Sequence, residues 1–303
     1  MKLPTRLPGR RFVIGVPYVW LGVFFLLPFL ILLYISFVDM GESISPFKPL
    51  WDPVTGILHL KYENYWTIFR ESGGGALFQT IYIEAYLRSI FYAFVTALLC
   101  LLLGYPFAYF IARSSPALRP ALLMMVMLPF WTSFLLRVYA WKGLLADQGV
   151  INRFLMAIGV IHEPIIMLYT SISMLVGMTY VYLPFMVLPL YANLVKMDVR
   201  LLEAAWDLGA TPLKAFWLVT VPLSRAGIVA GFMLVFIPCL GEFVIPSLLG
   251  GPENLMIGRV VWDEMFTSNN WPRASALAVV MIALIVVPLS LYYRSSASQE
   301  KGA

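Results

Sequence analysis

The chain has 303 residues, of which 61% are apolar and only 12% are charged, and its mean hydropathy is +0.84. Soluble domains are nearer half apolar and a quarter charged, and a soluble domain of this size could not hide so much apolar surface from water. The composition therefore excludes a soluble globular protein and predicts one whose solvent is lipid. For such a protein the positions of the basic residues are more informative than the net charge of +5, because they indicate orientation in the membrane.

Six stretches of the chain are apolar enough to cross the hydrocarbon core, which takes about 20 residues of helix. The first, residues 12–38, is too long for the apolar part of a signal peptide and lacks a small-residue cleavage site, so we expect it to be retained. The other spans are expected within 89–112, 120–145, 164–195, 225–249 and 273–294. The predicted fold class is an all-α integral membrane protein with six transmembrane helices.

Basic residues near the span ends indicate orientation, because they favour the cytoplasm. The tail at 1–11 is strongly basic and is expected to be cytoplasmic. Six spans then bring the tail at 295–303 and the basic loop at 196–225 to the same side of the membrane. Residues 39–88, which are rich in acidic side chains, become a periplasmic loop that precedes a core transmembrane domain at 89–294.

The stretch LLEAAWDLGATPLKAFWLVTVPLSRAGIVAG, residues 201–231, is charged and kinked although apolar sequence flanks it on both sides. A short helix expected at 199–208 gathers its leucines on one side and carries Glu203 and Asp207, four residues apart, on another. Gly209 is expected to end this helix, because glycine accepts the left-handed conformation that follows many helices.

A second short helix is expected after this glycine. Thr211 and Pro212 are a typical N-cap and first-turn residue for a helix through about Val219, and Val221–Pro222 would then turn the chain into the fifth span. Two short helices at an angle would project on the cytoplasmic side, where such a knob can fit a groove on a partner. The residues alone leave open the alternative of an amphipathic helix lying flat among lipid headgroups.

This stretch also resembles the signature of a transporter family. Glu203-Ala204-Ala205, Gly209 and Val219-x-Val221-Pro222 resemble the E-A-A-x3-G-x9-I-x-L-P signature of binding-protein-dependent ABC importer permeases, with two valines replacing Ile and Leu. The resemblance implies the type-I ABC importer permease fold, in which coupling helices, here at 199–222, dock into a cytoplasmic ATPase. The residues to which it assigns coupling are Glu203, Ala204, Ala205, Asp207, Gly209 and Pro222.

The same resemblance implies an assembly in the bacterial inner membrane. Its expected partners are a second homologous permease, two ATPase subunits that bind ATP and Mg, a periplasmic solute-binding protein and membrane lipid, without nucleic acid. The chain itself is expected to be a non-enzymatic transporter subunit without a cofactor, since it lacks both a G-x-x-x-x-G-K-[ST] phosphate loop and a G-x-S-x-G nucleophile motif.

Histidine and cysteine usage points to neither a metal site nor a disulfide. His59 and His162 stand alone in expected loops, without metal-ligand spacing. Cys100 and Cys239 lie inside apolar runs, which favours buried free thiols.

Three further segments narrow the resemblance to the polyamine (putrescine and spermidine) branch of these importers. They are LPFWTSFLLRVYAWKGLL at 128–145, YVYLPFMVLPLYANL at 180–194 and GEFVIPSLLGGPENLMIGRVVWDE at 241–264. The resemblance implies import of putrescine, spermidine or both, although related branches carry other small cationic or amino-acid-like solutes. A passive channel is the rival from another class, and a membrane-embedded enzyme is a weaker one.

Glu242 is the conspicuous candidate for a contact with a cationic cargo. It is expected inside the fifth span between Pro238 and Pro246, and a carboxylate at membrane depth costs about 2.5–3.5 kcal/mol on insertion scales unless it is paired or solvated. The prolines predict an irregular helix with freed carbonyl groups. Arg137, inside the third span, offers the competing interpretation of a structural ion pair with Glu242.

Aromatic side chains supply further candidates for the cargo path, since their faces attract ammonium groups. Trp131, Tyr180 and Tyr182 are the candidates, and the two tyrosines, two residues apart, cannot share one helix face. Interfacial belts are the alternative explanation for such residues. In the last outer loop, Asp263 and Glu264 are candidates for docking a binding protein, unless they simply face water.

Overall fold

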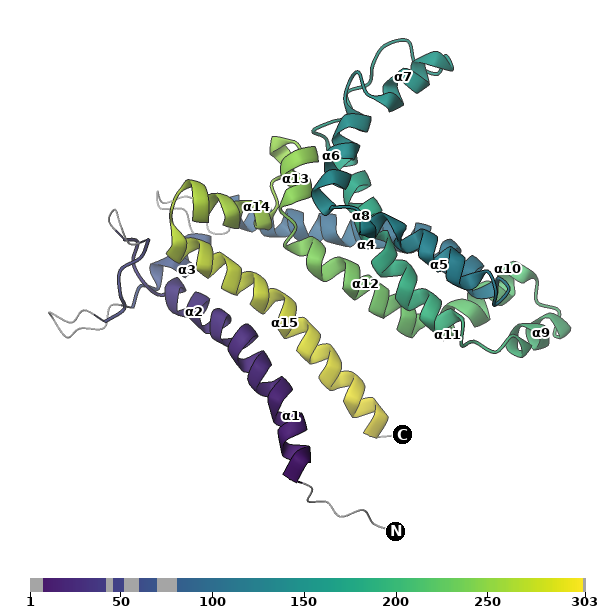
Figure 1. Ribbon diagram of the computed structural model, residues 1–303, viewed down its shortest axis with the longest axis horizontal. Helices are drawn as coiled ribbons and strands as arrows, with labels where there is room; N and C mark the ends of the chain where they lie inside the picture. The colour runs from purple at the N-terminus through teal and green to yellow at the C-terminus, as the bar shows by residue number, and fades with distance from the viewer. Residues whose placement is uncertain (1–7, 42–45, 52–59, 70–80, 302–303) are drawn as a thin grey trace. The chain divides into compact units, whose positions relative to one another are not determined.

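A computed structural model describes residues 8–41, 46–51, 60–69 and 81–301 (Figure 1). Helices dominate the described residues, in which β pairing is limited to one bridge between Met40 and Phe47. The expected all-α fold is therefore confirmed. The chain divides into two compact units, one of Met1–Ile83 with Val260–Ala303 and the other of Glu84–Arg259.

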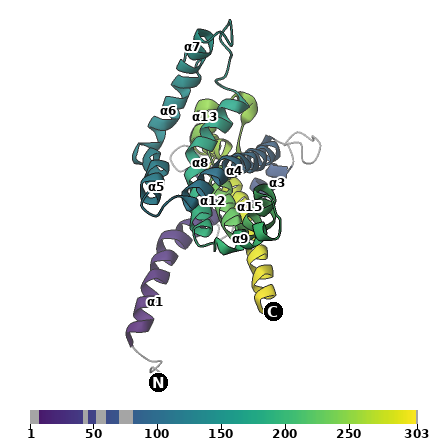
Figure 2. The same cartoon turned by 90° about the vertical axis from the view of Figure 1, so that its right-hand side faces the viewer.

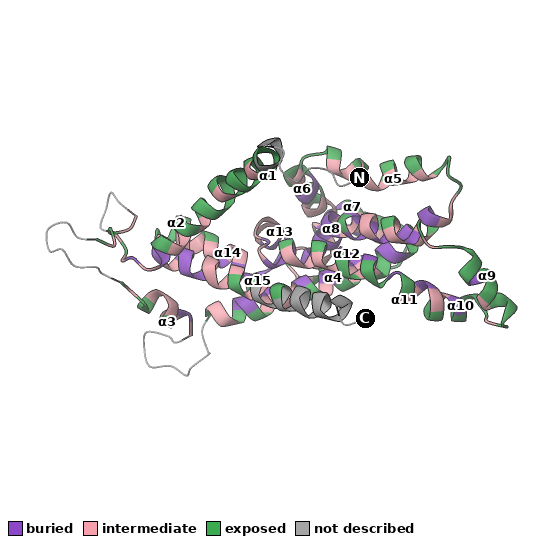
Figure 3. Cartoon of the chain, turned by 90° about the horizontal axis from the view of Figure 1, so that it is seen from below, coloured by how far each residue is buried: buried purple, intermediate pink, exposed green. Residues whose placement is uncertain are grey.

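The first unit is built around a long apolar helix. Helix α1 (Pro8–Leu21), the π-helical turn η1 (Gly22–Leu26) and α2 (Leu27–Ser36) follow one another without a break. Most of residues 12–36 in these helices are exposed (Figure 3), as expected for a helix whose solvent is lipid. Helix α15 (Trp271–Lys301) packs against α2 and against the short α3 (Glu63–Phe69).

Polar side chains satisfy the carbonyl groups at the end of α2, which have no partner within the helix. The Asn64 side chain donates to the carbonyl oxygens of Ser36 and Val38 at 3.0 and 2.9 Å. Beside this cap the Lys61 ammonium donates to Asp39 at 2.7 Å. This hydrogen bond holds the pKa of the Asp39 carboxyl below its usual value.

The second unit has three long helices and a set of short ones. Helices α4 (Ile81–Arg113), α8 (Ser171–Leu194) and α12 (Arg225–Leu240) are the long ones. Helix α12 runs alongside α8 in both Figure 1 and Figure 2. The short helix α13 (Val244–Leu249) packs between α8 and α6 (Phe134–Leu145), and its Ile245 and Leu249 are fully buried.

Two glycines allow the close approach of α12 to α8. A Cβ atom on Gly227 would lie 2.8 Å from the Asn193 Cβ and 3.0 Å from the Pro189 carbonyl oxygen. A Cβ atom on Gly231 would lie 2.7 Å from the Met186 sulfur. All three distances are shorter than van der Waals contact, so the two helices pack at this separation only because these positions carry no side chain.

Two sharp bends divide the remaining apolar helices. Helix α5 (Arg119–Met127) continues into the 3₁₀ turn η2 (Leu128–Trp131), and the chain then bends by 87° before α6. Helix α7 (Val150–Ala157) follows α6. A second bend, of 67°, separates the segment Pro212–Leu223 from α12.

By length and composition, Phe12–Ser36, Ile81–Arg113 and Ser171–Leu194 can each cross a membrane. The two bent pairs bring the number to five if each is one span, and Trp271–Val286 is a shorter apolar helix. The count of six spans, counting this last helix, stays a prediction.

Several expected boundaries differ from the observed helices. Helix α4 begins at Ile81 rather than near Ser89, because the helix continues ahead of the uncharged stretch through about two turns that contain the Glu84–Arg88 ion pair. The expected third span is interrupted at Thr132, whose backbone is extended. The expected fourth span begins only at Ser171, where Thr170 forms a capping box with Ser173.

Parts of the sequence-based interpretation fall on residues outside this description. They are the loop segments 42–45, 52–59 (with His59) and 70–80, the termini 1–7 and 302–303, and the basic side chains of the two tails. The cytoplasmic placement of both tails accordingly stays a prediction.

We expect Gly227→Ala to lower the thermal stability of the purified chain in detergent. Alanine normally stabilises a helix by about 1 kcal/mol relative to glycine, but overpacking against Pro189 and Asn193 costs about 1–3 kcal/mol. Gly143→Ala is the matched control, because Gly143 lies inside α6 with open space around its Cβ position. A Gly227→Ala chain that melts at or above the temperature of Gly143→Ala would contradict the packing described.

Candidate functional site

The charged stretch forms the two short helices that the sequence predicts. Helix α9 (Arg200–Asp207) ends at Gly209, whose φ is +82°. In this left-handed conformation the Gly209 N–H donates to the Trp206 carbonyl at 2.8 Å. The Ala210 N–H donates to the Ala205 carbonyl at 3.0 Å. The glycine in the signature therefore reverses the chain at the tip of the first short helix.

The second short helix is longer and less regular than expected. The Thr211 hydroxyl accepts from the Lys214 N–H, which caps α10 (Pro212–Ala215) as predicted. A π-helical turn η3 (Phe216–Thr220) and α11 (Val221–Leu223) then follow. The expected turn at Val221–Pro222 is wrong by about two residues, because a proline fits the first turn of α11 and the chain bends at Ser224 instead.

A hydrogen bond fixes this bend to a neighbouring helix. Ser224 is fully buried, and its hydroxyl lies 2.8 Å from the Tyr105 hydroxyl of α4 and donates to the Val221 carbonyl at 3.0 Å. The segment 199–224, which we call the coupling segment, is therefore attached to α4 at the point where it joins α12.

Most of the predicted coupling residues are accessible on this segment. Glu203, Ala204, Asp207 and Gly209 are exposed, whereas Ala205 and Pro222 are partly buried. Sequence reasoning overlooked Leu213 and grouped Leu208 with the other leucines on one side of the first short helix. Leu208 is 89% exposed and Leu213 is 70% exposed. These two leucines project beside the turn at Gly209, where helical periodicity alone does not predict which side chains are exposed.

A second irregular place lies at the other end of α12. The helix ends at Leu240, so Glu242 lies in a short link before α13, and the irregular helix expected between Pro238 and Pro246 is a complete break. The Glu242 Oε1 atom accepts the backbone N–H groups of residues 243, 244 and 245 at 3.2, 3.0 and 3.4 Å. This carboxylate is thus the cap of α13, which its negative charge also stabilises.

The other oxygen of Glu242 has one side-chain partner. Tyr182, on α8, donates its hydroxyl hydrogen to Oε2. Glu242 is only 8% exposed, and both of its oxygens are occupied. Each carboxylate oxygen has about two lone-pair sites, so Oε1 is saturated by its three N–H donors, whereas Oε2, with one donor, can still accept another.

Arg137 does not neutralise Glu242 in this conformation. Both side chains are described, and no ion pair joins them; the Arg137 guanidinium lies 5.0 Å from the Phe130 ring centre instead. Arg137 is 9% exposed, and its Nε and Nη1 atoms have no hydrogen-bond partner among the described residues. The structural ion pair considered from the sequence is absent here.

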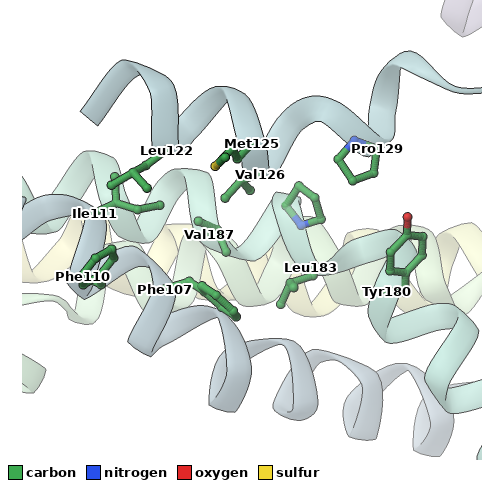
Figure 4. Close-up of a pocket in the computed structure, with 11 residues that line it drawn as sticks. Phe107, Phe110, Ile111, Leu122, Met125, Val126, Pro129, Tyr180, Leu183 and Val187 are labelled. Atoms are coloured by element: carbon green, nitrogen blue, oxygen red, sulfur yellow. The ribbon is translucent and has the colours of Figure 1, made fainter. Parts of the chain in front are cut away.

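The two tyrosines have different surroundings, as their spacing predicts. Tyr182 contacts Glu242, whereas Tyr180 packs edge-on against Trp141 and lines a cavity of about 360 Å³ between α4, α5 and α8 (Figure 4). The cavity has no acidic lining residue, so it offers nothing to neutralise an ammonium group. Trp131 is strongly exposed at the end of η2, outside both places.

The two acidic residues that were expected to dock a binding protein, Asp263 and Glu264, have different surroundings. Asp263 and Glu264 lie in the π-helical turn η5 (Asp263–Thr267). Glu264 is mostly buried, accepts the Tyr82 hydroxyl at 2.6 Å and lies 4.0 Å from Arg273. Glu264 therefore has an internal role in its unit, and binding-protein docking by this pair stays a prediction.

A buried polar cluster that sequence reasoning did not find holds the link after α13. Asn254 is nearly fully buried, and its Oδ1 accepts hydroxyls from Tyr92 at 2.6 Å and Ser171 at 2.8 Å. Ser89 accepts the Ile257 N–H at 2.7 Å. The only signal in the sequence was the presence of isolated polar residues within apolar stretches. That signal did not indicate which of these residues contact one another. Cys100 and Cys239 are buried and free, as expected.

Comparison with known proteins supports the signature. Residues 101–298 match the family described as binding-protein-dependent transport system inner membrane component. The chain is 37% identical to the spermidine/putrescine transport system permease protein PotB of Haemophilus influenzae, covering 95% of this chain and 94% of PotB. It is 36% identical to PotB of Escherichia coli, over 91% and 94% of the two chains.

Solved structures show the same fold at low sequence identity. A chain of a bacterial alginate ABC transporter, crystallised with a periplasmic protein bound to alginate pentasaccharide, matches with a TM-score of 0.65 and 16% identity over 92% of both chains. A chain of the MetNI methionine ABC transporter matches with a TM-score of 0.53 and 15% identity, over 71% of this chain and 94% of the other. The chain belongs to the family of binding-protein-dependent transport system inner membrane components and is a multi-pass permease subunit.

Proposed function

We propose that this chain is a permease subunit of an ATP-driven importer that moves polyamines, putrescine or spermidine or both, into the cytoplasm. The observation that carries this proposal is the similarity to PotB permeases, which extends over more than nine-tenths of both chains. Two local features agree with it: an exposed coupling segment at one end of α12 and a buried carboxylate at the other.

The coupling segment is the part that receives the work of ATP hydrolysis. We infer that Leu208 and Leu213 insert into a groove on a cytoplasmic ATPase and that Glu203 and Asp207 contact its rim, since apolar anchors with flanking charges suit such docking. ATP and Mg would be bound by two such ATPase subunits. Closure of the ATPase pair would move the coupling segment and, through α12, the link at Glu242.

The orientation and the remaining partners follow from this assignment. Docking to a cytoplasmic ATPase requires the coupling segment to lie on the inner side of the bacterial inner membrane. With the predicted six spans, both termini then lie on that side as well. A second homologous permease would complete the pathway, and a periplasmic solute-binding protein would deliver cargo on the outer side, where Asp263 is a candidate contact.

Glu242 and Tyr182 form the proposed ammonium site. Three of the four contacts to the carboxylate come from backbone N–H groups that are fixed in the first turn of α13. The fourth comes from the Tyr182 hydroxyl, which a side-chain rotation can remove. An ammonium group of the cargo would take its place at Oε2, beside the aromatic ring that favours a cation.

The substrate assignment is tested by uptake in cells. Deletion of the gene should abolish uptake of radiolabelled spermidine or putrescine at low external concentration, and the plasmid-borne gene should restore it. Amino acids and alginate oligosaccharides serve as control cargo. Restored uptake of a control cargo, with polyamine uptake unchanged by the deletion, would contradict the proposal.

The coupling role predicts that Glu203→Arg and Gly209→Pro abolish uptake while membrane insertion stays normal. The first reverses an exposed charge, and the second forbids the positive φ that turns the chain. Uptake and membrane abundance are measured together, with Gly143→Ala as a control remote from the segment. Normal uptake by both variants at normal abundance would remove the coupling assignment.

The ammonium site predicts that Glu242→Gln raises the KM for polyamine uptake by about tenfold or more, because a hydrogen bond to a charged group contributes about 1.5–3 kcal/mol. The glutamine oxygen can still accept the backbone N–H groups of α13, so assembly with the second permease should be retained. Glu242→Leu removes the cap as well and should lower stability. An unchanged KM with glutamine would leave Glu242 a structural residue.

A further inference from the structure

Helix α7 carries an apolar stripe that faces away from the rest of its unit. Val150, Phe154 and Ile158, which directly follows the last residue of α7, are spaced at intervals of four residues, so they lie along one side of the helix. They are 63, 62 and 54% exposed. Three large apolar side chains in a row on one face, open to the surroundings, indicate contact with something other than water.

The opposite side of α7 is fixed internally, which determines the direction of the stripe. Asn152 is fully buried; its Nδ2 donates to the Ile165 carbonyl at 2.9 Å, and its Oδ1 accepts the Ile165 N–H at 3.0 Å. These bonds close the connection 158–165 against the inner side of the helix. The stripe therefore cannot turn inward without breaking a buried pair of hydrogen bonds.

Helix α7 also lies close to residues that are typical of a membrane–water interface. The preceding helix α6 ends at Leu145, and four residues separate it from the start of α7 at Val150 (Figure 2). In the last turns of α6, Tyr139 is exposed and the Lys142 ammonium lies 5.5 Å from the Tyr169 ring centre. Tyrosine and lysine favour the headgroup level, and Leu145 is only about 5 Å further along the helix.

One cation flanks the stripe. Arg153 is exposed and lies on α7 between the stripe and the inner side that Asn152 occupies. At headgroup depth its guanidinium can reach a lipid phosphate while the stripe enters the acyl boundary, which is the arrangement of an interfacial amphipathic helix.

We propose that α7 lies in the membrane–water interface on the outer side of the inner membrane, with Val150, Phe154 and Ile158 in the lipid and Arg153 bound to phospholipid phosphate. The bilayer is favoured over a protein partner because α7 follows α6, which together with α5 is apolar enough to form one bent span, within a few residues of side chains that are typical of the headgroup level. The resulting anchor fixes the outer end of α6 at constant depth. This proposal holds whether or not the cargo is a polyamine.

The test measures the depth of α7 in a lipid bilayer. A nitroxide label is attached at Phe154→Cys in the full chain, purified with its accompanying subunits and placed in phospholipid nanodiscs. Collision with molecular oxygen, which concentrates in lipid, is compared with collision with a water-soluble nickel chelate. His162→Cys, at an exposed loop position, is the matched control, and the unmodified chain with its buried Cys100 and Cys239 gives background labelling.

We expect the label at 154 to collide with oxygen and to be shielded from nickel, with the reverse at 162, before and after addition of the binding protein. Strong nickel collision at 154 that falls when the binding protein is added would overturn the proposal in favour of a docking surface. Shielding of 154 from both reagents would also overturn it, because the stripe would then be covered by another subunit.

Discussion

The scarcity of water at membrane depth is the constraint on which this structure depends. Each N–H and carbonyl group released by a helix break must find a partner inside the protein, at a cost of several kcal/mol if it does not. The chain meets this requirement with side chains at each break: Glu242 caps α13, Ser224 closes the bend before α12, and Asn64 covers the end of α2. These polar residues permit irregular backbone where a transporter needs it.

Helix α12 connects two such breaks, and it thereby joins the proposed coupling segment to the proposed ammonium site. At one end the coupling segment is held to α4 through Ser224 and Tyr105. At the other end Glu242 is held by α13 and Tyr182. Close packing of α12 on α8 through Gly227 and Gly231 leaves the helix little freedom to deform between its two ends.

Hydropathy and turn chemistry predicted much of this arrangement. The two short helices, the left-handed Gly209 and the Thr211 cap follow from local backbone preferences, which the sequence carries directly. The prolines predicted an irregular helix near Glu242, but the end of α12 at Leu240 and the bend at Thr132 did not follow, because both lie within apolar sequence and depend on which partners satisfy the broken helix. The partner of Glu242 was equally hidden, since Arg137 and Tyr182 are both plausible from spacing alone and only packing distinguishes them.

The central claim is that ATP hydrolysis by partner subunits drives polyamine movement through this permease. The most direct measurement is the ATPase rate of the complete complex reconstituted in lipid, with its binding protein, across a panel of diamines, polyamines and uncharged solutes. The account predicts that putrescine or spermidine stimulates hydrolysis and accumulates inside the vesicles at the expense of ATP. Hydrolysis that no polyamine stimulates, or polyamine flux that proceeds equally well without ATP, would contradict it.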